Sequence, residues 1–284
     1  MSGDSSHLTS EPRASRTALG VAWLRAAHQL VDAPRILEDP IAVPILGPDT
    51  MRHLEARRQD LDTPGARGWR SHVVMRSRYA EDRLAAAAAR GVRQYVLLGA
   101  GYDTFAWRQP DWAHAMRIFE VDQPATQAAK RDACGAARLD VPRNLTFVPV
   151  NFERDQLGPS LSAAGVVLDA PVCFSWLGVM PYISEEASDD VFRLVAACPP
   201  SSEIILSFAP RDASRLTRTA VAVAALGEPW RTFIDADELA QRLKQHGFTR
   251  VDFLTPGDAE ARYFRNRSDS LPPPRRASIA AAIV

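Results

Sequence analysis

Two glycines and two acids stand at positions where a nucleotide-like ligand could bind. Gly99 and Gly101 follow a short apolar run, and Glu120 and Asp122 end the next one. An apolar run that meets glycines predicts a buried strand ending in a tight turn, where backbone atoms can approach a ligand closely. Roughly 20 residues separate the glycines from the acids, the spacing at which a strand-end carboxylate binds ribose hydroxyls. The pattern favours a cofactor site, although the glycines could instead only relieve the turn.

The two acids lie two residues apart, so on a strand both side chains point to one face. Like charges this close are costly unless something binds beside them, or unless one of them caps the helix that begins near Pro124. Position 104 carries Thr104, where a dinucleotide fingerprint has its third glycine, and this disfavours a diphosphate. A ligand with a ribose and no phosphates fits better, and an NAD(P)-dependent oxidoreductase is the alternative enzyme.

Hydrophobic periodicity places a helical region before this turn and alternating strands and helices after it. The spacing of apolar residues predicts helices over 17–30, 36–46 and 69–90. Strands are predicted at 94–98, 117–121, 145–150, 166–176 and 203–208, with helices at 124–137, 154–164, 185–197 and 235–246. Repeated strand–helix winding predicts an α/β fold with a mostly parallel, doubly wound sheet covered on both faces.

The end of the chain predicts an antiparallel closure of that sheet. Residues 249–254 and 261–264 are expected to form a closing hairpin around Pro256 and Gly257. Rossmann-like methyltransferase sheets end in this way, whereas nicotinamide-binding domains usually stay parallel. The predicted organisation is a disordered N-terminus (1–15), a single domain (16–268) with an N-terminal helical lid or extension (16–92) on a core (93–268), and a Pro/Ala-rich tail (269–284) with no assigned role.

Composition narrows the possible function classes. The chain has 284 residues, 46% of them hydrophobic, with formal net charge +0 and pI near 7.0. It can bury one substantial core and has no global field to attract polyanions, so nucleic acid is not favoured as a partner. The polar N-terminus does not resemble a signal peptide, and charge or proline interrupts each apolar run before bilayer-spanning length. We expect a cytoplasmic protein without a membrane partner.

Cysteine and histidine usage argues against disulfides and metals. Cys134, Cys173 and Cys198 are widely spaced and odd in number, which suits reduced thiols. The six histidines show no paired spacing with cysteine or carboxylate of the kind that zinc needs. No metal site is expected.

Several short motifs together carry a family resemblance. They are Thr17-Ala18-Leu19-Gly20, Met75-Arg76-Ser77-Arg78-Tyr79, the glycine turn with Asp103-Thr104, and the segments 119–124, 148–152, 174–178 and 227–230. With these motifs the chain resembles, from about Arg16 to Phe264, the leucine carboxyl methyltransferase-like family of S-adenosylmethionine-dependent enzymes, in particular its bacterial branch. The resemblance implies a Rossmann-like class I methyltransferase fold and S-adenosyl-L-methionine as cofactor.

The resemblance also implies roles for individual residues. Arg76 would bind the methionyl carboxylate through its planar guanidinium, and Asp122, with Glu120 beside it, would bind the ribose. Asn151 and Phe152 would meet the adenine, with Asn151 standing where the family usually has an aspartate. The remaining expected cofactor contacts are Gly99, Gly101, Ser175 and Trp176.

One of these positions departs from other branches of the family. They have a glutamate after the fourth strand, where this chain has Ser175 and Trp176. Trp176 is expected either to face the sulfonium through a cation–π contact or to line the substrate pocket. Together with Asn151, the missing acid motivates a second alternative, a non-catalytic cofactor-binding regulatory protein of the same fold.

The chemistry of methyl transfer limits the acceptor. Transfer from a sulfonium is an in-line displacement, so the enzyme mainly aligns the reactants and excludes water. A carboxylate is already ionised near neutral pH and needs no general base, whereas a phenol would profit from one. No His/Asp dyad stands out, so no catalytic residue is assigned, and O-methylation of a carboxylate or acidic hydroxyl is favoured. The resemblance implies that the helix 17–30 covers the methyl donor, that the segment 211–230 lies over the acceptor pocket, and that the acceptor is a small natural product or peptide. Apolar residues in both segments suggest an acceptor with considerable hydrophobic area, although they could instead serve ordinary helix packing.

Overall fold

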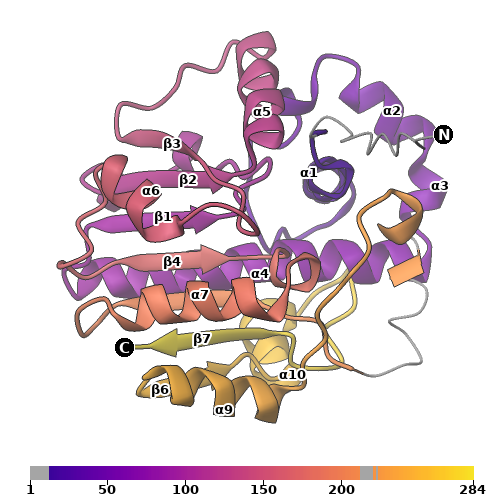
Figure 1. Cartoon of the computed structure of the whole chain (residues 1–284). Helices are drawn as coiled ribbons and strands as arrows, with labels where there is room; N and C mark the ends of the chain where they lie inside the picture. The colour runs from indigo at the N-terminus through magenta and orange to yellow at the C-terminus, as the bar shows by residue number, and fades with distance from the viewer. Residues whose placement is uncertain (1–12, 212–219, 222) are drawn as a thin grey trace, which may run out of the picture.

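The computed structural model describes residues 13–211, 220–221 and 223–284 (Figure 1). The predicted disorder of residues 1–12 lies outside the described residues, as do 212–219 and 222 of the segment expected over the acceptor pocket. The first described residues lead directly into α1 (Arg16–Val31), where the Ser15 side chain accepts a hydrogen bond from Ala18 N. A serine at this position satisfies a free amide of the first helical turn, so it sets the start of α1.

In the described part of the chain, seven strands form one sheet in the order β3-β2-β1-β4-β5-β7-β6. Neighbours from β3 to β5 pair in parallel, and β7 runs antiparallel to both β5 and β6. The strands are β1 (Gln94–Leu98), β2 (Arg117–Asp122), β3 (Leu145–Pro149), β4 (Cys173–Trp176), β5 (Glu203–Ser207), β6 (Arg250–Phe253) and β7 (Ile279–Ile283). The strand order reverses between β1 and β4, the place where open α/β sheets bind ligands.

Helices cover both faces of this sheet, as predicted. Val96 and Leu98 of β1 belong to the core layer shared with α6 (Leu157–Ala163), α7 (Glu185–Ala196) and α9 (Ala236–His246). Tyr95 and Leu97 of the same strand belong to the layer shared with α4 (Pro64–Ala89). Figure 1 shows α4 behind the sheet and α7 in front of it. Alternate side chains of β1 therefore pack into the cores on opposite faces of the sheet. The helix α5 (Pro124–Ala136) packs beside β2 and β3.

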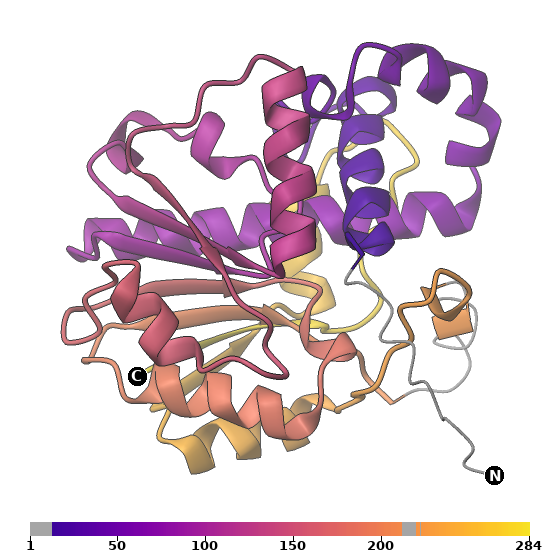
Figure 2. The ribbon, with the colours of Figure 1, turned by 45° about the horizontal axis from the view of Figure 1, so that its top comes forward.

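The helices before β1 extend past the sheet. Pro64 begins α4 after Thr63, whose side chain accepts a hydrogen bond from Ala66 N. With 26 residues, α4 reaches beyond the strand ends, and α1 packs against this overhang (Figure 2). The same region contains η1 (Pro44–Leu46), α2 (Thr50–Ala56) and α3 (Arg58–Leu61). This arrangement brings α1 opposite the carboxyl ends of the parallel strands.

The prediction of a strand at 261–264 was wrong. Those residues lie in η5 (Glu260–Phe264), a π-helix that continues α10 (Pro256–Ala259). Thr255 caps α10 by accepting from Asp258 N, and Pro256 occupies its first position, so this segment starts a helix rather than a hairpin turn. Strand β4 is also shorter than the predicted 166–176, because a turn closes between Val167 and Ala170.

The antiparallel partner of β6 comes instead from the tail that had no assigned role. Strand β7 inserts between β5 and β6, and its residues 280–282, all alanine, are fully buried. Alanine has low strand propensity, so no sequence pattern marked this segment. Pairing on both sides and helices on both faces make it a central strand. No helix in the described ranges is long and apolar enough to cross a membrane.

Candidate functional site

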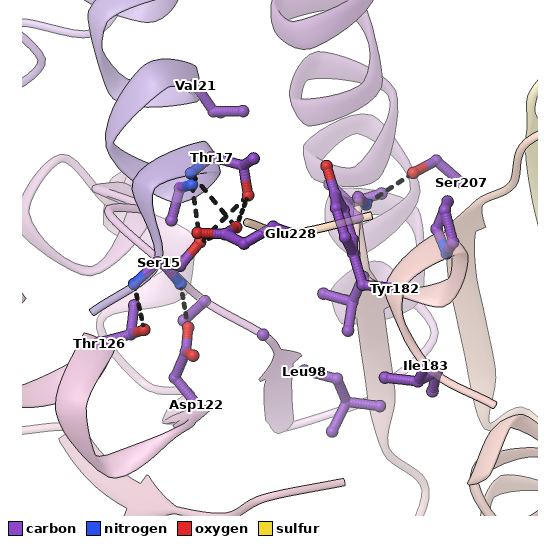
Figure 3. Close-up of a pocket in the computed structure, with 18 of the residues that line it drawn as sticks. Ser15, Thr17, Val21, Leu98, Asp122, Thr126, Tyr182, Ile183, Ser207 and Glu228 are labelled. Carbon is purple, nitrogen blue, oxygen red and sulfur yellow. Dashed lines mark hydrogen bonds between the residues drawn. The ribbon is translucent and has the colours of Figure 1, made fainter. Parts of the chain in front are cut away.

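A cavity of about 640 Å³ lies at the carboxyl ends of the central strands, with α1 and α4 on its other side (Figure 3). Among the sequence-predicted cofactor residues, those that line it are Arg76, Gly99, Gly101, Asp122, Asn151, Phe152 and Ser175. The structure places Glu120 and Trp176 outside its lining. The short helix η4 (Met180–Tyr182) and the segment 227–231 complete the wall.

The glycine turn after β1 requires its glycines. Gly99 has φ +68° and Gly101 has φ +50°, both in the left-handed region that side chains disfavour. A Cβ at Gly99 would lie 2.1 Å from Val179 Cγ2, so even a methyl group there has no room. The amides of Gly99 and Ala100 donate to Val121 O at 2.7 and 3.0 Å. The turn is thus anchored to β2 and presents bare backbone to the cavity.

Asp122 is held at the end of β2 by backbone amides. Its two carboxylate oxygens accept hydrogen bonds from Gly101 N and Gln123 N. Burial raises the pKa of Asp122, and these two amides oppose that rise by stabilising the charged form. A carboxylate has about four lone-pair sites, so two remain for a ligand. Asp122 is therefore an oriented acceptor in the cavity wall.

Glu120 has a different role from its neighbour. It is buried in the protein, where its carboxylate pairs with Lys130 of α5, and Lys130 lies 5.0 Å over the ring of Trp107. Burial raises the pKa of Glu120 to about 7, and Lys130 opposes that rise. Both acids share one face of β2, but α5 covers the earlier one. Glu120 therefore joins β2 to α5 and does not line the cavity.

Ser175 and Trp176 are separated by strand alternation. Trp176 is fully buried in the α7 layer and meets Phe192 edge-on at 5.8 Å between ring centroids. Ser175 points to the other face, where its hydroxyl accepts from Tyr95 OH at 2.9 Å. Adjacent strand residues cannot both face one ligand, so the expected contact of Trp176 with a sulfonium has no support in its position.

Arg76 is a buried cation beside the cavity without an acidic partner in the described ranges. It is 8% exposed, and no carboxylate there lies within ion-pair distance of it. Its guanidinium packs on Gly178, because a Cβ at that glycine would lie 2.7 and 2.8 Å from its terminal nitrogens. Burial lowers the pKa of Arg76 to about 10, so the group stays charged at neutral pH. An unpaired buried guanidinium suits a carboxylate ligand.

Asn151 and Phe152 follow β3 on the far side of the turn. The side-chain oxygen of Asn151 accepts from Glu153 N at 3.0 Å, and Asn151 N donates to Asp155 at 2.7 Å. These bonds close a tight local turn that presents both residues to the cavity. Phe152 is half-buried against the α6 and α7 layer, with part of its ring left for a ligand.

A buried ionic network under the glycine turn was not predicted. Arg25 of α1 bonds Asp39 at 2.6 Å, Asp103 at 3.1 Å and the Thr104 hydroxyl at 2.7 Å, and that hydroxyl donates to Asp39 at 2.7 Å. Thr104 occupies the position of the third glycine of a dinucleotide fingerprint, and its hydroxyl joins the turn to α1. Arg108 extends the network to Glu81 of α4. The network joins α1 and α4 to the turn.

Glu228 closes the cavity over the start of α1. Its carboxylate accepts from Ser15 Oγ at 2.8 Å, from Arg16 N at 2.6 Å, and from the amide and hydroxyl of Thr17 (Figure 3). A carboxylate at a helix N-terminus satisfies free amides and complements the helix dipole. We call this contact between Glu228 and residues 15–17 the clasp.

Four aromatic rings lie on the side of α4; three of them were not predicted, and the fourth, Trp230, belongs to the segment 211–230 that was expected over the acceptor pocket. Trp69, His72, Tyr182 and Trp230 all line the cavity. His72 follows Trp69 by three positions and Arg76 follows His72 by four, so these side chains share one face of α4. That spacing was the available signal, whereas Tyr182 and Trp230 come from distant segments.

An open sheet of this order, with a glycine turn, a strand-end carboxylate and a buried arginine around one cavity, has the architecture of Rossmann-like S-adenosylmethionine-dependent methyltransferases. Residues 18–196 match the family model described as leucine carboxyl methyltransferase. The chain belongs to the leucine carboxyl methyltransferase family, and it is an S-adenosyl-L-methionine-dependent methyltransferase. The resemblance inferred from its motifs is confirmed.

Relatives and a solved structure agree with this assignment. The chain is 30% identical over 285 residues to "Putative S-adenosyl-L-methionine-dependent methyltransferase YktD" of Bacillus subtilis (strain 168), covering 90% of this chain and 93% of that one. A protein of the same designation from Mycobacterium marinum is 31% identical over 298 residues and covers 90% of each chain. The crystal structure of a DUF574 family protein from Streptomyces avermitilis MA-4680 superposes with TM-score 0.57 at 16% identity, covering 95% of this chain and 97% of that one. That structure shares the fold.

Proposed function

We propose that the protein is an O-methyltransferase that methylates a carboxylate of a small natural product or peptide. Bound S-adenosylmethionine supplies a methyl group on a positively charged sulfur. The residues of this chain bind that donor, orient the acceptor in line with the methyl group and exclude water. The observation that carries the proposal is Arg76, a buried charge beside the cavity without an acidic partner among the described residues.

The donor-binding roles follow the chemistry of each wall. Arg76 binds the methionyl carboxylate with its guanidinium fork, and the bare backbone at Gly99 and Gly101 lets the ligand approach. Asp122 accepts from the ribose hydroxyls with the lone pairs that its two amide bonds leave free. The adenine and the remaining contacts are assigned to Asn151, Phe152 and Ser175.

A carboxylate acceptor is supported by the lack of a suitable base among the described lining residues. Burial and the nearby charge of Arg76 lower the pKa of His72 to about 3, so its imidazole is a weak base. The lining carboxylates are already bonded: Asp103 to Arg25, Asp122 to amides, Glu153 to Arg231 and Glu228 to the clasp. An acceptor that arrives ionised needs none of them.

Calorimetric titration with S-adenosylhomocysteine tests the donor site. Asp122→Ala is expected to abolish binding, and Arg76→Gln to weaken it by about 10- to 100-fold, because each removes a charged hydrogen-bonding group. Arg78→Gln is the matched control, since Arg78 lies two residues further along α4 and pairs with Asp82 at the surface. Absence of binding by the unmodified protein at millimolar ligand would overturn the proposal.

A further inference from the structure

Four of the aromatic side chains that line the cavity form one continuous wall, which we call the aromatic wall: Trp69, His72, Tyr182 and Trp230. Trp230 is central, with ring centroids 6.4 Å from Trp69 and 6.4 Å from Tyr182. Trp69 in turn lies 6.1 Å from His72. Three separate segments supply these rings, namely α4, η4 and the residues after 227, so the wall does not result from the periodicity of one helix.

The geometry of the aromatic wall suits a flat ring. Its ring pairs meet at steep angles of 82°, 62° and 80°, and edge-on pairs form corners rather than a closed stack. Figure 3 draws Tyr182 and Ile183 on the side of the pocket away from Ser15, Thr126 and Asp122. Tyr182 of the wall therefore lies across the pocket from Asp122, where a second substrate can be seated beside the donor.

One polar atom within the wall has no protein partner. Trp230 Nε1 is buried and makes no hydrogen bond to any described residue. A buried indole N–H usually finds an acceptor, and leaving it unpaired costs free energy. A ligand that offers an oxygen acceptor next to an aromatic ring would satisfy it.

The charges around the wall exclude a cationic substrate. The four carboxylates of the described lining are all engaged with arginine, backbone or the clasp, as given above. Two lining cations are close to the wall in the chain: Arg76 lies one helical turn beyond His72 on α4, and Arg231 follows Trp230. His72 is neutral at physiological pH because burial lowers its pKa to about 3. An amine would meet no free anion here, whereas a neutral or anionic ring system would meet no repulsion.

We infer that the aromatic wall is the acceptor subsite and that the acceptor is an aromatic carboxylic acid whose ring packs against Trp69, Tyr182 and Trp230. The inference rests on the proposed methyltransferase function and names its substrate class. In the transfer, a carboxylate oxygen of the acid forms the new bond to the methyl carbon as the carbon–sulfur bond breaks, and that bond's electron pair stays on sulfur. A neutral ester and a neutral thioether result, and no proton moves.

Four probes of one size distinguish the parts of this inference: 2-naphthoate, decahydro-2-naphthoate, 2-naphthol and 2-naphthylmethylamine. Each is titrated calorimetrically into protein saturated with S-adenosylhomocysteine, and each is assayed for methylation with S-adenosylmethionine. We expect 2-naphthoate to bind about tenfold tighter than its saturated counterpart, because the ring contacts are lost in the latter. We expect the naphthol and the amine to be methylated at less than a tenth of its rate.

Variants locate the effect on the wall. Trp230→Leu and Trp69→Leu should each weaken 2-naphthoate binding by about tenfold and leave S-adenosylhomocysteine affinity within about twofold. Trp112→Leu is the matched control, because Trp112 is 40% exposed and does not line the cavity. Thermal unfolding checks that each variant is folded. Two tryptophan variants are used so that, if one misfolds, the other still tests whether the wall binds 2-naphthoate.

Three outcomes would overturn the inference. They are equal use of the saturated acid, preferred use of the amine or naphthol, and unchanged 2-naphthoate binding in a folded Trp230→Leu or Trp69→Leu variant. Failure of both acids to bind, while S-adenosylhomocysteine still binds, also refutes the aromatic acid and leaves the donor site intact. Failure of S-adenosylhomocysteine itself refutes the proposed function first, so the two failures are distinguishable.

Discussion

The two halves of the cavity are built in different ways. The donor half is built mainly from backbone at strand ends: the amides of Gly99 and Ala100 donate to Val121 O, and the amides of Gly101 and Gln123 orient Asp122. The other half is side chains, with rings from α4 and η4 and from Trp230 meeting across the chain. The comparison suggests a division of roles. Donor binding depends on the backbone of the sheet, whereas selectivity for the acceptor depends on side chains that can be substituted without disturbing the sheet.

If this comparison is right, changes near the donor half cost stability, and changes on the opposite side alter binding more than folding. The largest effect is expected from Glu120→Gln, which leaves the ammonium of Lys130 buried without a charged partner. Such a loss costs about 3–5 kcal/mol of unfolding free energy, measured by urea denaturation. S-adenosylhomocysteine affinity of the folded fraction should change little, because Glu120 does not line the cavity.

The double variant Glu120→Leu with Lys130→Met is the control for this prediction. It removes both charges from the same buried site, so most of the stability should return. If Glu120→Gln instead abolished donor binding without lowering stability, Glu120 would belong to the site after all, and the separation of the two acids would be wrong.

Gly99→Ala is expected to cost slightly less, about 2–4 kcal/mol. The left-handed φ contributes about 1 kcal/mol or more, and the clash with Val179 contributes about 1–3 kcal/mol. Adding Val179→Ala removes the methyl group that the new Cβ would meet. The double variant should therefore recover the stability lost to the clash but not the stability lost to the left-handed backbone. Urea denaturation of the single and double variants measures both. Full recovery would mean that backbone conformation is unimportant at this turn.

The donor half could be predicted from sequence because its information is local. Gly99, Gly101 and Asp122 belong to one strand–turn–strand unit, and the spacing of that unit identifies it. Local reasoning could not separate Glu120 from Asp122, since both share a face and only the tertiary position of Lys130 distinguishes them. The helices α1 and α4 and the parallel strands followed from periodicity for the same reason, whereas the helix predicted over 36–46 was wrong, since only η1 is helical there.

The acceptor half could not be predicted because its contacts join distant segments. Tyr182 carries no local motif, and although Trp230 belongs to the motif 227–230, only the fold brings its ring to Trp69 and Tyr182. The same limit explains β7, a run of alanines that becomes a central strand through pairing with β5 and β6. By contrast, the opposed directions of Ser175 and Trp176 follow from strand alternation alone and could have been predicted.

The pH dependence of stability tests whether His72, in the acceptor half, is buried as the structure shows. Burial and Arg76 lower its pKa from 6.5 to about 3, so the folded protein keeps it neutral while the unfolded chain binds a proton below pH 6.5. The stability from this group is fully present above pH 6.5 and is lost as pH falls toward 3. Between pH 7.5 and 5, the unmodified protein should lose about 2 kcal/mol more than His72→Asn in urea denaturation.

The matched control for His72 is His114→Asn, because His114 is exposed on the surface. That variant should follow the unmodified protein at each pH. Identical pH dependence of His72→Asn and the unmodified protein would mean that His72 is not desolvated in solution, and the acceptor half would then be wetter than the structure implies.

The smallest effect is expected at the clasp, where Glu228 joins the segment after 227 to the start of α1. Glu228→Gln keeps one acceptor oxygen but removes the charge that faces the amides of Arg16 and Thr17. The attachment should weaken by about 1 kcal/mol, which is about fivefold in an equilibrium constant. Because the clasp spans the cavity and not the core, this loss should appear as roughly fivefold faster release of S-adenosylhomocysteine in stopped-flow, with little change in unfolding.

Glu238→Gln, which removes a surface partner of Arg211, is the control and should leave the release rate unchanged. A release rate unaffected by Glu228→Gln would mean that the donor leaves without opening the clasp, so α1 and the segment after 227 would be a fixed wall rather than a lid.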